Sequence, residues 1–333
     1  MMMRYTSSRN VLMPPIAIVW LVAGCMACWF AGYEFSIGYP VYEDMGATPL
    51  WNAVCLALSR RELIYGFGFL LTLAGAFLVY RANYMLSFIH EKTLLPFWIY
   101  LLLECTNPDL FPIKASGVGV ICLVLVIYQL FVSYHNPEAR DRAFNVGWIV
   151  GLGSLLWVYL LCFLPLFWIG MYKFRSLSWR TFLATLIGVA AVYWLVLAWC
   201  VWAGDYGLLL VPLQLLSAVR FFSFESASWL YWLGIGYTIL LTVVASMNIF
   251  SHEHDDNLRS RQYLSFLMLI GLWSLLLFFL YEPSEEFLAV MWAPASVLIA
   301  HLFAVVKKRY MIWIYHLSVV FYYLIFAIRV WNF

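Results

Sequence analysis

Long apolar runs, separated by short polar segments, occupy almost the whole chain. The interior of a bilayer offers the backbone no hydrogen-bond partners, so a chain that crosses it must do so as helices. A spanning helix needs roughly 20 apolar residues. The pattern therefore predicts an all-α fold, a polytopic transmembrane helix bundle. We expect spans near 15–33, 63–80, 94–105, 115–133, 181–202, 229–249, 263–281, 287–306 and 311–331.

The stretch 144–172 is too long for one span. A single helix of about 29 residues would be roughly 43 Å long at 1.5 Å per residue, against a hydrocarbon core of about 30 Å. Arg140 and Arg142 precede the stretch, and the loop 171–180 that follows it holds three more cations. Lysine and arginine concentrate in cytoplasmic loops, so both flanks are expected in the cytoplasm. We therefore predict a hairpin of two short helices that turns near 154–157.

The interrupted apolar stretch 206–228 can be placed by counting cations. If it stays outside, fourteen Lys and Arg residues face the cytoplasm and five face outward; if it crosses, the split becomes eleven to eight. The first arrangement fits the positive-inside rule better. It gives about eleven spans, with the amino terminus in the cytoplasm and the carboxyl terminus outside. We expect one integral membrane domain over 1–333. Its parts are an amino-terminal module (14–205, with the outer loop 34–62 and the hairpin 144–172), an outer interfacial or re-entrant segment (206–228) and a carboxy-terminal four-helix module (229–333).

Composition supports a membrane protein. The chain is 65% hydrophobic and 11% charged, whereas soluble proteins carry about 25% charged residues. A net charge of +2 with scattered basic residues does not favour a nucleic-acid partner; membrane lipid is the expected partner and a bacterial inner membrane the expected location. Val22 to Cys25 resembles a lipoprotein cleavage box, but the apolar run continues to Phe30, which favours a retained first helix over lipidation.

Acidic residues gather on the outer side of this topology, although only cations were used to set it. They are Glu34, Glu43, Asp44, Glu62, Asp109, Asp205, Glu225, Glu282, Glu285 and Glu286. The adjacent carboxylates Glu43 and Asp44 could act as a general base toward an acceptor hydroxyl or hold a divalent cation. Arg60 and Arg61 could bind phosphate through paired hydrogen bonds. The alternative is a hydrated loop whose arginines anchor the next span at the lipid headgroups.

Glu104 falls near the outer end of the third predicted span, shortly before Asp109. An ionisable residue at membrane depth indicates a functional site, and a carboxylate that reaches the interface is the equal alternative. The run 252–256, His-Glu-His-Asp-Asp, contains metal-binding residue types. Consecutive loop residues rarely converge as zinc ligands need to, so a solvated loop is favoured and no metal site is expected. His301 and His316 fall inside spans, where packing or an interhelical hydrogen bond is expected rather than catalysis.

One stretch carries a family resemblance. Residues 142–155, Arg-Ala-Phe-Asn-Val-Gly-Trp-Ile-Val-Gly-Leu-Gly-Ser-Leu, with the basic loop to Arg180 and the run to Trp199, resemble an uncharacterised family of polytopic membrane proteins of Bacteroidota. Residues 83–112 resemble that family as well. The likeness covers roughly 60–205. The family implies no particular activity.

The same region distantly resembles membrane glycosyltransferases of the C superfold, which use sugars linked to lipid phosphates. Those enzymes have an acidic motif in the first outer loop, a second acid in the next, and a glycine-rich helix in a short hairpin. Glu43-Asp44, Asp109 and 147–152 occupy the matching places. A basic residue common after that helix is absent, since Trp157 and Tyr159 stand there.

The resemblance implies a role in assembling envelope glycans, with the active face outside. Asp44 or Glu43 would be the base and Asp109 a second carboxylate. The substrate, a polyprenyl-phosphate-linked sugar, would be bound by Arg60, Arg61, Glu104 or Arg220, with a divalent cation as an open possibility. This hypothesis requires Asp44 and Asp109 to share one outward groove, no more than about 15 Å apart. A non-catalytic scaffold or assembly subunit and a lipid or solute transporter are the alternatives.

Overall fold

The computed structural model describes residues 15–35, 48–58, 60–86, 89, 93–219, 229–251, 258–281, 284–305 and 309–331. Every element in these ranges is a helix. The described part of the chain contains eight helices that are long and apolar enough to cross a membrane. They are α2 (Pro15–Phe35), α4 (Arg61–Leu86), α6 (Ala115–Val132), α9 (Trp179–Ala203), α11 (Trp229–Ser251), α12 (Leu258–Leu280), α13 (Ser284–Val305) and α14 (Arg309–Trp331). The chain is thus an all-α, multi-pass membrane protein, as predicted.

Shorter helices join or accompany these spans. They are α3 (Pro49–Ala57), α5 (Leu95–Cys105), the 3-10 turn η1 (Pro108–Leu110), α7 (Arg140–Leu156), the 3-10 segment η2 (Val158–Phe163), α8 (Leu164–Lys173) and α10 (Gly207–Ser217). Three predicted spans correspond to α5, α7 and the unit formed by η2 and α8. These are shorter than a membrane-spanning helix, so the count of eleven spans stays a prediction.

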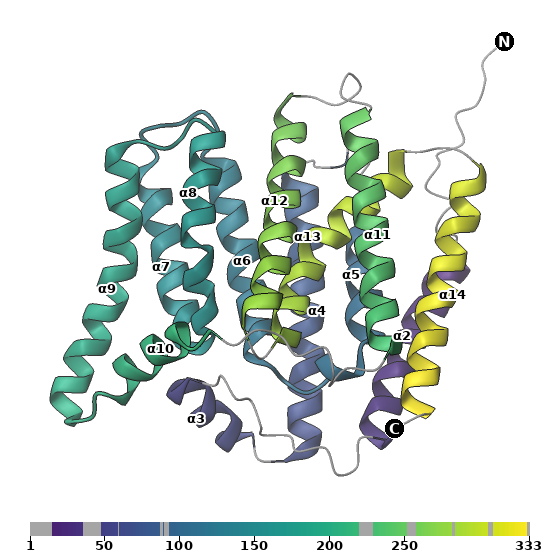
Figure 1. Cartoon of the computed structure of the whole chain (residues 1–333), viewed down its shortest axis with the longest axis horizontal. Helices are drawn as coiled ribbons and strands as arrows, with labels where there is room; N and C mark the ends of the chain where they lie inside the picture. Colours follow the sequence, from purple (N-terminus) through teal and green to yellow (C-terminus); the bar gives the residue numbers. More distant parts are fainter. Residues whose placement is uncertain are drawn as a thin grey trace.

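The bundle has two ends, which lie at the bottom and top of Figure 1. We call the lower one the Asp109 end; it holds α3, α10, the connection between α5 and α6, and the carboxyl end of α14. The opposite Arg142 end holds the start of α7 and the loop between α8 and α9. The sequence predicts that the Asp109 end faces outward, and that orientation remains a proposal.

The predicted break within 144–172 is confirmed. Helix α7 ends at Leu156, and Trp157 adopts an extended conformation (φ −131°, ψ 94°) before η2 and α8 continue the chain. Pro165 lies in the first turn of α8, where its missing N–H costs no helical hydrogen bond. The two basic loops meet at the Arg142 end: the His135 amide donates to the Phe174 carbonyl (2.9 Å), and Ser178 Oγ donates to the Pro137 carbonyl (3.1 Å). The segment therefore turns back, as the charge pattern required.

Helix α13 is the centre of the bundle. Within Glu285–Val305, 94% of the residues in an 18-residue window are buried. The helix packs against α4, α5, α6, α11 and α12. Small residues such as Ala289, Ala293 and Ser296 let neighbouring backbones approach closely. Since α5 and α6 belong to the predicted amino-terminal module, that module and the carboxy-terminal helices share one interior.

The segment after α9 does not extend across the bundle. Helix α10 has 11 residues, about 16 Å at 1.5 Å per residue, and lies obliquely at the Asp109 end in Figure 1. The Tyr281 hydroxyl, at the end of α12, donates to the Leu216 carbonyl in α10 (3.1 Å). This position agrees with an outer interfacial segment, although the relation of 206–228 to the membrane stays a prediction.

Candidate functional site

An ion pair joins η1 to α14 at the Asp109 end. The Arg329 guanidinium donates to the Asp109 carboxylate and to the Asn107 side-chain oxygen (2.9 Å), and it lies 5.4 Å from the centre of the Tyr231 ring. The side chains of Asp109 and Arg329 are 12% and 9% exposed. Asn107 and Asp109 lie in the connection between α5 and α6, Tyr231 in α11 and Arg329 in α14, so this group ties that connection to both helices.

Arg61 is similarly engaged at the start of α4. Its guanidinium donates to the Tyr33 carbonyl at the end of α2, and it lies 4.6 Å and 5.8 Å from the centres of the Tyr33 and Tyr65 rings. The preceding Arg60 is exposed. Arg61 is half-buried and connects two helices, whereas Arg60 is open to solvent.

Two acidic residues in the first turn of α13 also contact other elements. Lys114 Nζ, just before α6, lies 2.9 Å from Glu285 Oε2. Trp157 Nε1, at the break of the hairpin, donates to Glu286 Oε2. Carboxylates suit the amino-terminal turn of a helix because they complement its dipole. Both contacts fix the start of the central helix against α6 and the hairpin.

Glu104 differs from these residues. It lies in the last turn of α5, is 4% exposed, and hydrogen-bonds with Tyr100 one turn earlier. Its other carboxylate oxygen, Oε1, is buried and has no hydrogen-bond partner. A buried polar atom normally has a partner, since leaving it unsatisfied costs about 1–3 kcal/mol, and more for a charged group. Among the described acidic residues, Glu104 is therefore the one with a buried carboxylate oxygen that lacks a hydrogen bond.

A small polar cavity surrounds this carboxylate. We call it the Glu104 chamber and define it by Thr72 (α4), Tyr100 and Glu104 (α5), Lys114, Ser116 (α6) and Ala289 (α13). Its cavity volume is about 20 Å³, room for a water molecule or a small ion, and it is partly open to solvent. The chamber thus lies among four helices, including the central one, beneath the Asp109 end.

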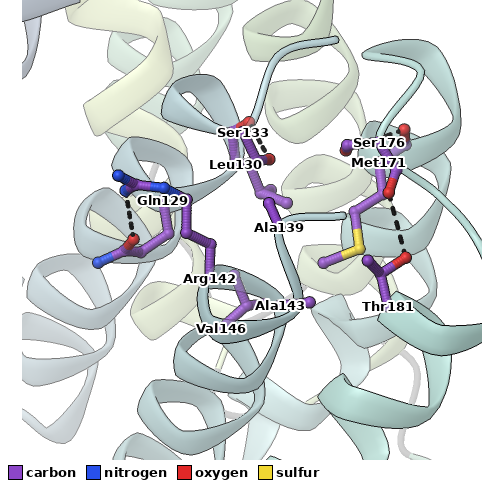
Figure 2. Close-up of a pocket in the computed structure, with 10 residues that line it drawn as sticks. All are labelled: Gln129, Leu130, Ser133, Ala139, Arg142, Ala143, Val146, Met171, Ser176 and Thr181. Carbon is purple, nitrogen blue, oxygen red and sulfur yellow. Dashed lines mark hydrogen bonds between the residues drawn. The ribbon is translucent and has the colours of Figure 1, made fainter. Parts of the chain in front are cut away.

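A second cavity lies at the Arg142 end and has a different character (Figure 2). Its polar side chains already have partners: Arg142 donates to Gln129 (3.2 Å), Ser133 to the Leu130 carbonyl, and Thr181 to the Ser176 carbonyl. These bonds close the junction between the two basic loops. The polar side chains of this cavity are satisfied by local hydrogen bonds, whereas the Glu104 chamber contains an unsatisfied carboxylate oxygen.

The sequence candidates are distributed unevenly over the structure. Of the described candidates, Glu104 lines the chamber and Asp109 is paired with Arg329. Arg61 is bound to Tyr33, and Arg60 is exposed. Glu43, Asp44 and Arg220 lie outside the described residues, as does the run 252–256. The predicted meeting of Asp44 with Asp109 is therefore untested. His301 is buried in α13 and His316 is exposed on α14. Within the described ranges no three His, Cys, Asp or Glu side chains converge as metal ligands.

Sequence reasoning missed Thr72, Ser116 and Arg329 as parts of these sites. Thr72 and Ser116 are isolated polar residues in apolar runs, a weak signal because threonine and serine also bond to their own helix. Arg329 was one of the five cations that the topology places on the outer side, and no contact was predicted for it. Its partner Asp109 is 220 residues away in sequence, so no local pattern could connect them.

Comparisons of the chain with known protein families, with curated proteins and with solved structures found no match. The function must therefore be argued from the site itself.

Proposed function

We propose that the chain is a transporter-class protein of a bacterial inner membrane that admits a small polar ligand from its Asp109 end into the Glu104 chamber. The observation that carries the proposal is the Glu104 carboxylate, which is buried among the helices beneath the Asp109 end with one oxygen unsatisfied. Ionisable side chains inside membrane bundles typically lie on substrate or ion pathways. The ligand enters from outside if the orientation expected from the cations holds.

The contacts of Asp109 and Arg61, two residues proposed for catalysis and phosphate binding, favour transport over catalysis. A general base must reach the substrate's proton, and the Asp109 carboxylate is 12% exposed and paired with Arg329. Arg61 is held by the Tyr33 carbonyl and lies over the Tyr33 and Tyr65 rings, which fixes its side chain against the protein. Among the described candidates, Glu104 alone combines burial, a cavity and an unsatisfied oxygen.

A glycosyltransferase-C-like enzyme of envelope glycan assembly is the second candidate. One observation favours it: a cavity beside Asp109 is lined by Asn107, Arg329 and the aromatic residues Tyr231, Trp292 and Tyr322. Such surroundings suit a sugar and a lipid phosphate. This function needs Glu43 or Asp44 as the base, with a polyprenyl-phosphate-linked sugar as substrate.

Cysteine accessibility tests the transport proposal without a known ligand. Thr72→Cys, in a variant without the seven native cysteines, is expected to react with a membrane-impermeant thiol reagent from the Asp109 side. In a smaller fraction of molecules it should react from the opposite side, because a transporter exposes its site to each side in turn. Ala245→Cys, fully buried in α11, is the matched control and should stay protected.

The alternatives give different results in the same measurement. Labelling of Thr72→Cys from the Asp109 side alone would contradict transport and favour the enzyme, whose chamber needs only one opening. Protection from both sides would favour a non-catalytic scaffold or assembly subunit.

A further inference from the structure

The Glu104 chamber has one cation, Lys114, for two carboxylates. The Lys114 ammonium pairs with Glu285 (2.9 Å) and also acts electrostatically on Glu104, so the two carboxylates together exceed it by one charge. Tyr100 donates one hydrogen bond to the Glu104 carboxylate but brings no charge. A buried charge without a counter-charge is costly. Either a proton or a bound cation must therefore accompany Glu104.

The surroundings supply the oxygen atoms that a hard cation prefers. Besides the Glu104 carboxylate, the hydroxyl-bearing side chains Thr72, Tyr100 and Ser116 line the chamber. The irregular connection 106–114, which includes the 3-10 turn η1, passes beside it. Its Phe111 carbonyl oxygen approaches α4 so closely that a Cβ atom on Gly68 would lie 2.5 Å from it. Irregular backbone inside a membrane bundle is tolerated where it is buried or lines a cavity, and its carbonyl groups can coordinate cations.

Helix geometry adds to the attraction. Glu104 occupies the last turn of α5, which ends at Cys105. The carboxyl end of a helix carries partial negative charge from its free carbonyl groups. Helix ends of this kind coordinate Na⁺ or protons in transporters built on broken helices. The dipole of α5 therefore adds to the attraction that the Glu104 carboxylate exerts on a cation.

The charge count selects a monovalent ion. Protein Ca²⁺ sites usually gather several carboxylates among six to eight oxygen ligands, and here a single carboxylate enters the chamber. Soft transition metals require thiolate or imidazole ligands, and the chamber lining contains neither. One carboxylate with neutral oxygens matches one positive charge.

We infer that the Glu104 chamber binds a monovalent metal cation, Na⁺, through the Glu104 carboxylate together with the hydroxyl groups of Thr72 and Ser116. The inference rests on the proposed function in so far as both concern the same chamber. It deepens that proposal by naming the ion whose binding accompanies transport. Cation binding can be measured at equilibrium, so it does not depend on a transport assay.

Thermal unfolding of the purified full chain in detergent tests the inference. Tm is measured in NaCl, KCl and choline chloride at one ionic strength. We expect a saturable rise in Tm with Na⁺ and none with choline, because a ligand that binds only the folded state stabilises it. Glu104→Gln should abolish the rise. The exposed Asp205→Asn, also at the Asp109 end, is the matched control and should keep it.

An equal rise in choline chloride, or a rise that survives Glu104→Gln, would overturn the inference. If Glu104→Gln fails to give folded protein, Thr72→Val decides instead, since it keeps the charge. It should weaken apparent Na⁺ affinity about tenfold, as loss of a 1.4 kcal/mol contact would, and unchanged affinity would contradict the site. The two proposals can fail separately. If Na⁺ binds but Thr72→Cys is labelled from the Asp109 side alone, the cation site stands and the transport proposal is contradicted. If Thr72→Cys is labelled from both sides but Na⁺ does not bind, the transport proposal stands and the cation site is contradicted.

Discussion

Gly147→Ala is expected to destabilise the protein by about 3 kcal/mol or more. Gly147 lies where α7 and α9 cross, and a Cβ atom there would lie 2.0 Å from the Thr185 carbonyl oxygen and 3.1 Å from the Gly188 Cα. Both are backbone atoms, so no side chain can rotate away. The two helices would have to separate along one of the most extensive contacts in the bundle. Thermal unfolding in detergent, followed by circular dichroism, measures the loss.

Gly66→Ala is the matched control for this change. Gly66 also lies within a helix, α4, but a Cβ atom there meets nothing within 4 Å. Alanine favours helix over glycine by about 1 kcal/mol, so the control should unfold at the same or a higher temperature. A Gly147→Ala variant as stable as the control would show that α7 and α9 do not pack as described.

Arg329→Met is expected to cost about 3 kcal/mol. The variant keeps the apolar stem of the side chain but leaves the Asp109 carboxylate, 12% exposed, without its cation. Removing one partner of a buried ion pair is strongly destabilising because the remaining charge stays uncompensated. The connection between α5 and α6 would also lose its link to α14. Chemical or thermal unfolding of the purified variant measures the effect.

A double variant separates this charge effect from lost packing. Adding Asp109→Asn to Arg329→Met removes the stranded charge, so part of the lost stability should return. Glu285→Gln is the comparison for a more exposed pair, since Glu285 is 40% exposed, and pairs of that kind contribute about 1 kcal/mol or less. Equal losses of stability for Arg329→Met and Glu285→Gln would mean that the buried Asp109–Arg329 pair stabilises the protein no more than the more exposed pair does.

Features that depend on local pattern were predictable. The stretch 144–172 exceeded the length of one span between two basic loops, and it breaks at Trp157 with both loops hydrogen-bonded at one end. Helix α3 begins directly after Thr48, whose side chain caps it by accepting from the Trp51 amide, a local signal. In both cases residues close in sequence determine the structure.

Features that depend on tertiary packing were not predictable. Hydropathy does not distinguish α13, buried on all sides, from an apolar helix that faces lipid. The glycine-rich run of α7, which resembled an enzyme motif, is explained by close approach to α9 at Gly147 and Gly151. Nor could the sequence show that Asp109 has Arg329 as its partner while Glu104, five residues earlier, keeps an unsatisfied oxygen.

The central claim is that Glu104 is reserved for a ligand, whereas Asp109 supports the fold. Its most direct test compares the Tm of Glu104→Gln and Asp109→Asn in sodium-free choline buffer. Without a cation the buried Glu104 charge is a cost, so Glu104→Gln should unfold at the wild-type temperature or above it. Asp109→Asn should unfold several degrees lower, because it leaves Arg329 without its charged partner. A loss of stability in Glu104→Gln as large as that in Asp109→Asn would contradict the claim.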